Sequence, residues 1–249
     1  TFDIKMHSTT ARNSSSNSCS ESEEGEDEED QLLKLTPISG LPQQRKKLLS
    51  YPKQIFLIIG NEFCERFSYF GMQAVLAIYL KHKLDFTEDT STVIYHTFSG
   101  LCYFTPIFGA ILADQLFGKF KTIFLGSLIY IIGQVILAVA AIPLKLPPVE
   151  FTLIGLFLMT VGTGGIKPCG SAFGGDQFKL PEQKKHLKTF FSVWYFTINA
   201  GALISTIITP IFRQDFQCFG DETCYPLAFG MPALLMLIAI VILVSGKNM

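Results

Sequence analysis

Beyond residue 50, the chain alternates between long apolar runs and short polar connections. Six of the runs are roughly 20 residues or longer, enough to cross ~30 Å of hydrocarbon as a helix. They cover residues 52–80, 90–113, 121–142, 151–170, 190–212 and 226–245. Charged and turn-forming residues fill the connections. This pattern predicts an all-α membrane protein with six transmembrane helices.

The first 50 residues have a different composition. Eight of the ten residues from Glu21 to Asp30 are acidic, and apolar residues are sparse. Such a segment buries too little apolar surface to offset the entropy of ordering. We therefore expect two parts, a disordered acidic cytoplasmic tail over residues 1–50 and a six-helix membrane unit over residues 51–249.

Composition supports this division and excludes several classes of function. The chain is 49% hydrophobic and only 16% charged, against about 25% charged in average soluble domains. Its 20 basic and 21 acidic residues nearly cancel, so nothing indicates a nucleic-acid partner. The sequence shows no nucleophile–base pair, metal-ligand spacing or phosphate-binding loop. We expect no enzymatic activity, no metal and no cofactor.

The basic residues between the runs predict the orientation. Because cytoplasmic loops are enriched in Lys and Arg, the side with more of them should face the cytosol. Eleven lie on one side: Arg45, Lys46, Lys47, Lys53, Lys119, Lys121, Lys179, Lys184, Lys185, Lys188 and Lys247. Four lie on the other: Lys81, Lys83, Lys145 and Arg213. The N-terminus is therefore expected in the cytosol.

This orientation places Cys218 and Cys224 in a connection on the outer side. That compartment is oxidising, and five residues separate the two cysteines, so a local disulfide is favoured. Two free thiols are the alternative.

Three charged residues interrupt the first apolar run. Glu62, Glu65 and Arg66 are spaced i, i+3 and i+4 and share one helix face. An ionised group at mid-bilayer costs about 2.5–3.5 kcal/mol, so the three should face protein or water and find partners. A static ion network is one interpretation. The favoured one is a substrate and proton site, in which a substrate anion competes for the cation and the freed carboxylate takes up a proton.

Other polar residues in the runs are weaker candidates. Lys167 lies close to the predicted end of the fourth run and could extend to the membrane interface instead. Tyr69 is too deep in the first run for an interface anchor. His96 and Asn199 are ordinary helix-to-helix contacts as readily as functional groups.

These residues stand in motifs that resemble those of the proton-dependent oligopeptide transporter family of the major facilitator superfamily. The run Asn-Glu-Phe-Cys-Glu-Arg-Phe-Ser-Tyr over residues 61–69 resembles the family's E-x-x-E-R-F motif. Further blocks resemble family signatures at 162–168, 174–178, 191–195 and 198–201. The connection after the second run, with Gly109, Asp114, Gly118, Lys119 and Lys121, resembles the superfamily's loop motif. The resemblance covers residues 51–247 and is strongest to animal di- and tripeptide transporters.

The resemblance implies roles for individual residues. Glu62, Glu65 and His96 would take part in proton coupling, and Asp114 and Lys119 in a cytoplasmic gate. The substrate-binding set would be Arg66, Tyr69, Tyr103, Lys167, Tyr195 and Asn199. The ligands would be di- and tripeptides and protons, in a lipid bilayer. One departure is Phe70, where the family motif continues with a second tyrosine.

Family members have twelve spans with the substrate site between two six-span halves. The chain would therefore be the N-terminal half of a proton–peptide symporter, and its partner would be the missing C-terminal half. We expect a multi-pass protein of the plasma membrane, with an endosomal or lysosomal membrane as the alternative. A carrier of another small anion, such as nitrate or an organic acid, and a truncated regulatory isoform are the competing functions.

Overall fold

The computed structural model describes residues 54–143, 147–218, 220 and 223–246. Within them the chain forms six long α-helices and one short π-helical turn. In chain order these are α3 (Gln54–His82), α4 (Glu88–Leu112), η1 (Ala113–Phe117), α5 (Lys119–Ala140), α6 (Pro148–Gly175), α7 (Lys184–Asp215) and α8 (Tyr225–Gly246). The predicted tail, residues 1–50, lies outside the described residues.

The prediction of six helices is confirmed. Five of them, from α4 with η1 to α8, are long and apolar enough to cross a membrane. The remaining helix, α3, has 29 residues, and Glu62, Glu65 and Arg66 interrupt its apolar run. The protein is therefore an all-helical, multi-pass membrane protein.

Several helices extend beyond the predicted apolar runs. Helix α6 continues through Pro168 to Gly175 instead of ending at Gly170, and α7 begins at Lys184 rather than at Phe190. Hydropathy marks only the part of a helix that lies in hydrocarbon, whereas backbone hydrogen bonds continue into the polar interface. A proline inside a membrane helix is tolerated because its surroundings can satisfy the freed backbone groups.

The second helix has identifiable start and stop signals. The Thr87 hydroxyl oxygen accepts a hydrogen bond from the Thr90 backbone N–H at 3.3 Å, and Glu88 and Asp89 occupy the first turn. Both features favour a helix N-terminus. After η1, Gly118 has φ 77°, a backbone conformation that favours glycine, and the chain turns there into α5.

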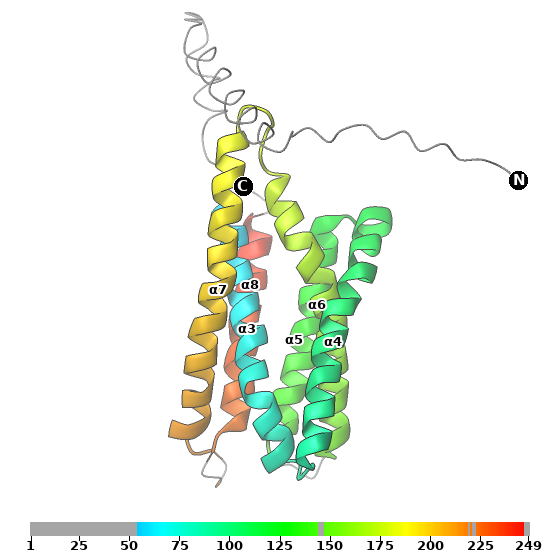
Figure 1. The fold of residues 1–249 in the computed structure, drawn as a ribbon, viewed down its shortest axis with the longest axis vertical. Helices are drawn as coiled ribbons and strands as arrows, with labels where there is room; N and C mark the ends of the chain where they lie inside the picture. The colour runs from blue at the N-terminus through cyan, green and yellow to red at the C-terminus, as the bar shows by residue number, and fades with distance from the viewer. Residues whose placement is uncertain (1–53, 144–146, 219, 221–222, 247–249) are drawn as a thin grey trace, which may run out of the picture. The chain divides into compact units, whose positions relative to one another are not determined.

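The helices pack in two groups of three (Figure 1). Helices α4, α5 and α6 form one group, and α3, α7 and α8 form the other. The main contact between the groups runs from α5 to α8. Figure 1 shows α3 between α7 and α4, so side chains on α3 can meet residues of both groups.

Glycines bring the backbones of the first group into direct contact. A methyl group added at Gly126 would lie 2.8 Å from the Gly162 carbonyl oxygen, and one at Gly133 would lie 2.7 Å from that of Gly155. Gly109 on α4 meets the Gly164 backbone on α6 in the same way. Small residues at such positions allow membrane helices to approach closely.

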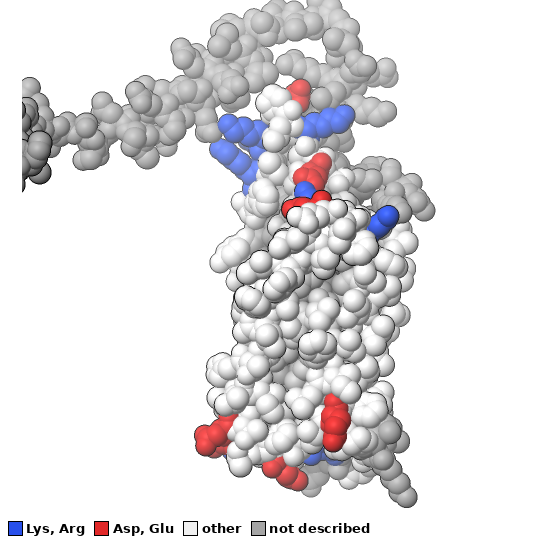
Figure 2. All heavy atoms as spheres, turned by 90° about the vertical axis from the view of Figure 1, so that its right-hand side faces the viewer, with Lys and Arg blue, Asp and Glu red and all other residues white. Residues whose placement is uncertain are grey.

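The distribution of charge and the burial of each helix show which faces of the six-helix membrane unit are not covered by its other helices. On the face in Figure 2 the charged side chains lie near the two ends, with an uncharged zone between them. In their apolar stretches, only 17% of α4 and 22% of α7 is buried, against 50% of α5 and of α6. The least covered helices are thus α4 and α7.

A disulfide joins Cys218 to Cys224 in the connection between α7 and α8. Next to it, the Cys224 backbone N–H donates to the Arg213 carbonyl at 2.9 Å. The Arg213 guanidinium donates to the Tyr225 hydroxyl at 3.2 Å. The bridge therefore closes a turn that the backbone also holds.

We expect Cys218 and Cys224 to resist alkylation in the unreduced protein, because both sulfurs are in the bridge. Cys64, on the partly covered side of α3, is the control thiol that denaturation should expose to the reagent. Mass spectrometry of unreduced, alkylated peptides measures both. Two alkylated thiols at 218 and 224 would contradict the bridge and weaken the predicted orientation of the membrane unit.

Candidate functional site

Two carboxylates and one guanidinium meet on α3. Arg66 Nε lies 2.7 Å from Glu62 Oε1 and 2.9 Å from Glu65 Oε2. The three residues are 9%, 2% and 0% exposed in the order Arg66, Glu62 and Glu65. The spacing predicted from the sequence therefore produces a compact, buried ion cluster.

The two carboxylates are held differently. Glu62 accepts a well-formed hydrogen bond from Arg66 Nε. The contact from Arg66 to Glu65 is an ion pair without hydrogen-bond geometry, and neither Glu65 oxygen has a hydrogen-bond partner among the described residues. Because a buried charge is costly unless it is paired and hydrogen-bonded, Glu65 is the less well stabilised carboxylate.

Glycines of two other helices border the cluster. A methyl group at Gly170 on α6 would lie 3.3 Å from Glu62 Oε2 and 3.2 Å from the Trp194 ring. One at Gly201 on α7 would lie 3.1 Å from Arg66 Cβ. Side chains at these two positions would press on the ion cluster, so α6 and α7 help to enclose it.

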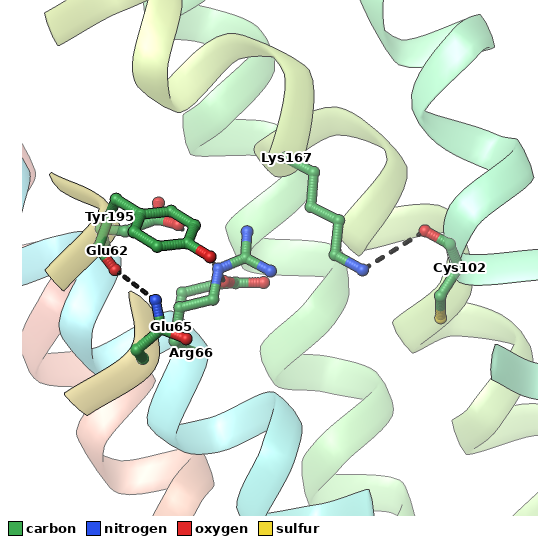
Figure 3. Close-up of polar contacts among 7 residues, drawn as sticks. Glu62, Glu65, Arg66, Cys102, Lys167 and Tyr195 are labelled. Carbon is green, nitrogen blue, oxygen red and sulfur yellow. Dashed lines mark hydrogen bonds and ion pairs between the residues drawn. The ribbon is translucent and has the colours of Figure 1, made fainter. Parts of the chain in front are cut away.

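Lys167 on α6 is the second cation of the site. Its Nζ donates to the Cys102 carbonyl oxygen at 3.4 Å. The same atom lies 4.3 Å from the Tyr69 ring centroid and 4.6 Å from that of Tyr103. Figure 3 shows the ammonium turned toward α4 rather than toward the α3 carboxylates. Lys167 thus points toward α4, between Tyr69 and Tyr103.

The remaining residues proposed for substrate binding fall into two kinds. Tyr69 is 1% exposed, whereas Tyr103 and Tyr195 are 69% and 70% exposed. The Asn199 amide donates to the Tyr195 carbonyl at 2.8 Å, within its own helix. Figure 3 shows Tyr195 on the α7 side of Arg66. The structure therefore brings Tyr69 and Tyr103 to Lys167, and Tyr195 to the side of the ion cluster.

His96 is not joined to the cluster by any contact in the described ranges. Its side chain is exposed, and its ring packs edge-on against Tyr95 with 5.3 Å between centroids. Its assignment to the proton path stays a prediction that rests on the resemblance.

Asp114 and Lys119, the two residues proposed for a gate, do not form an ion pair with each other in the described part of the chain. Lys119 Nζ binds Asp176 Oδ2 at 2.5 Å, which links the start of α5 to the end of α6. Asp114 lies in η1 and is exposed. Asp176 stands in the Gly-Gly-Asp-Gln-Phe block at 174–178, but the sequence alone does not say which cation it meets.

Tyr130 on α5 is a site residue that sequence reasoning missed. Its hydroxyl is fully buried and has no hydrogen-bond partner among the residues described. It packs in the same buried core as Tyr69 and Cys102. A tyrosine in an apolar run resembles an interface anchor, so only the three-dimensional packing reveals this position.

A sequence profile of the POT family (PTR2) matches residues 120–249, just over half of the chain. "Peptide transporter family 1" of Drosophila melanogaster is 52% identical over 202 residues, which are 81% of this chain and 27% of that protein. "Solute carrier family 15 member 2" of Homo sapiens is 55% identical over 202 residues, or 80% and 27%.

Solved structures that resemble this chain are also POT family transporters. The POT family transporter PepTSo superposes with a TM-score of 0.70 at 36% identity, over 80% of this chain and 38% of that one. An auto-inhibited POT family peptide transporter superposes at 0.69 and 35% identity, over 79% and 37%. The chain belongs to the POT family of transporters. It spans about a quarter of the length of the curated relatives it matches.

Proposed function

We propose that this chain is the N-terminal half of a proton-coupled symporter of di- and tripeptides. The observation that carries the proposal is the buried cluster in which Glu62 and Glu65 share Arg66, with Lys167 as a second cation nearby. The relatives named as peptide transporters support the substrate class.

Charge balance connects substrate binding to proton uptake. Glu62, Glu65, Arg66 and Lys167 in their ionised forms sum to zero. A peptide carboxylate bound at Arg66 or Lys167 leaves one excess negative charge in a buried site, which is costly. A carboxylate that loses its cation binds a proton more readily, and one proton restores neutrality. Substrate and proton therefore enter together.

The membrane potential can supply the energy for accumulation. One charge moving through 100 mV gains about 2.3 kcal/mol. At about 1.4 kcal/mol per tenfold concentration ratio, this supports a ratio of inside to outside peptide concentration of several tens.

The substrate amino group would be met by the half that lies beyond this chain, opposite the sparsely covered faces of α4 and α7.

The proposed setting is a plasma membrane with residues 1–50 in the cytosol. The described Lys residues at the start of α5 and around the start of α7 support this orientation, because basic residues gather on the cytoplasmic side. In this orientation the disulfide between α7 and α8 is on the outside.

The test is uptake of a labelled dipeptide by the full-length protein in cells at two external pH values. Uptake that rises in acid and is blocked by excess unlabelled dipeptide is expected. Uptake of nitrate or a simple organic acid with none of the dipeptide would replace the proposal with an anion carrier.

The 249-residue chain alone should insert in a membrane without transporting. It offers cations for a carboxylate, but alternating access needs a second repeat to rock against. The measurement is dipeptide uptake into liposomes that contain the chain, with the full-length protein as the control. Uptake by the chain alone above that of empty liposomes would overturn the assignment of a half-transporter.

A further inference from the structure

Most of the lysines in the described part of the chain lie at one end of the membrane unit. At the end where α6 leads into α7, the described residues include six lysines and three acidic residues, against three basic and five acidic residues at the other end. Figure 2 shows Lys and Arg side chains gathered toward one end. Four of the six lysines fall within ten residues. Together with Leu180 they form what we call the α6–α7 patch, which comprises Lys179, Leu180, Lys184, Lys185 and Lys188.

The connection between α6 and α7 is a hydrogen-bonded turn with one buried side. Phe178 is buried, and its ring packs on that of Phe190 with 5.6 Å between centroids. The Gln183 side chain is also buried and accepts a hydrogen bond from the Lys179 backbone N–H at 2.8 Å. Because these contacts hold one side of the turn against the protein, the side chains of Lys179 and Leu180 are left exposed on the other.

The lysines of α7 stand at the level of the lipid headgroups. The apolar run of α7 begins at Phe190, and Lys188 and Lys184 precede it by about 3 Å and 9 Å along the helix axis. The headgroup layer is about 5–8 Å thick on each side of the hydrocarbon. Lys184, Lys185 and Lys188 lie within about 100° of one another around the axis, so their exposed side chains form one basic face.

Leu180 adds an apolar side chain to this basic face. It is 62% exposed next to Lys179, and at a lipid surface it can enter the acyl boundary while the lysines contact headgroups. The excess of lysines on this side follows the positive-inside rule, but that rule requires neither their gathering nor an exposed leucine. Helix stability does not explain them either, because cations are unfavourable near a helix N-terminus and the first turn of α7 has no acidic residue.

We propose that the α6–α7 patch binds the phosphate groups of anionic lipids in the leaflet on its side of the membrane, with Leu180 inserted beside them. Juxtamembrane clusters of four or more basic residues attract anionic headgroups, and each lysine ammonium is a compact point charge that can meet a separate phosphate oxygen. An acidic protein segment would match the charge of the patch, but it would give Leu180 no apolar surroundings. The observations therefore favour a lipid over a protein partner.

Neutral substitutions give the size of the expected effect. One lysine near an anionic surface strengthens attachment by about fivefold. Replacing Lys184 and Lys185 together with glutamine should therefore weaken lipid binding by about tenfold to thirtyfold. Both side chains are exposed, so the fold should survive.

The experiment is native mass spectrometry of the purified full-length protein titrated with phosphatidylinositol 4,5-bisphosphate in the presence of excess phosphatidylcholine. Wild type is compared with Lys184→Gln/Lys185→Gln and with Lys184→Arg/Lys185→Arg, which keeps both charges. Lys81→Gln/Lys83→Gln is the matched control, because it removes two lysines at the other end of the unit. Binding is measured without dipeptide, so the result does not depend on the proposed transport function.

The Kd of the first bound lipid should rise tenfold to thirtyfold in the glutamine pair and change less than threefold in the arginine pair and the control. A change below threefold in the glutamine pair, or an equal loss in the control, overturns the inference.

Two further arms test the identity of the ligand. Leu180→Ser should weaken binding of the lipid but not of soluble inositol 1,4,5-trisphosphate, which has no acyl chains. If the soluble headgroup binds as tightly as the lipid and Leu180→Ser affects neither, the patch is a site for free phosphates and the lipid assignment is wrong. If lipid binds only after residues 21–30 are deleted, the acidic segment is the partner of the lysines and the lipid assignment is again wrong.

Discussion

Glu65→Gln should abolish proton-driven accumulation of peptide while sparing exchange. Gln preserves the volume of the side chain and can still hydrogen-bond, so the packing around this fully buried position should survive. It cannot pair as an anion with Arg66 and cannot take up a proton. The accumulation ratio should fall from several tens, the limit set by about 100 mV, to about one.

The measurement is uptake and counterflow in cells, each normalised to the amount of protein at the surface. Glu88→Gln is the matched control, because its side chain is 79% exposed at the start of α4 and pairs with Lys81. A static ion network predicts instead that Glu65→Gln lowers the amount of folded protein. If Glu65→Gln still accumulates peptide against a gradient in acid, Glu65 does not couple protons to transport.

Arg66→Lys should weaken substrate binding by about tenfold to a hundredfold. The Arg66 Nε contacts both carboxylates at 2.7 and 2.9 Å, which leaves the other two guanidinium nitrogens for a ligand. An ammonium group is a single point charge and does not reproduce this planar arrangement of donors. Loss of one charge-assisted hydrogen bond is worth about 1.5–3 kcal/mol.

The expected result is a raised KM for dipeptides with a much smaller effect on a dipeptide amide, which lacks the carboxylate. Arg213→Lys is the control substitution, since Arg213 lies at the end of α7 beside Tyr225. Equal losses for dipeptide and amide would show that Arg66 holds the fold of the site rather than the substrate carboxylate.

The helices could be predicted from the sequence because membrane spans have a strong and simple signal. Runs of about 20 apolar residues predict helices, and each of the six runs lies largely within a helix of the structure. The ends could not be placed as well. Residues such as Lys184 and Lys185 are helical at the start of α7 but polar, so hydropathy does not include them.

The ion cluster could be predicted because charges are rare in membrane helices and helix geometry fixes their neighbours. Glu62 and Arg66, four residues apart, had to lie on one face of α3, and they form an ion pair. Contacts between residues of different helices cannot be predicted from a spacing of this kind. The partner of Lys119 is Asp176, 57 residues away, and the aromatic neighbours of Lys167 come from α3 and α4.

The neutral residues of the site were the hardest to find. Tyr103, Tyr195 and Asn199 came from the family motifs, since nothing in their own positions distinguishes them from helix contacts. Neither its position in an apolar run nor the family motifs distinguish Tyr130. Its hydroxyl is buried without a partner among the described residues, which is a property of the folded packing.

The glycine contacts between α4, α5 and α6 restrict how the unit can move. Gly126 faces Gly162, Gly133 faces Gly155, and Gly109 faces Gly164, with backbone against backbone. Sliding one helix by a single residue would bring a larger side chain against the opposing carbonyl, so these three helices keep a fixed register. Shear within this group is therefore blocked, and a working cycle has to move the three helices as one body or bend them where Pro106 in α4 and Pro168 in α6 each remove one backbone hydrogen bond.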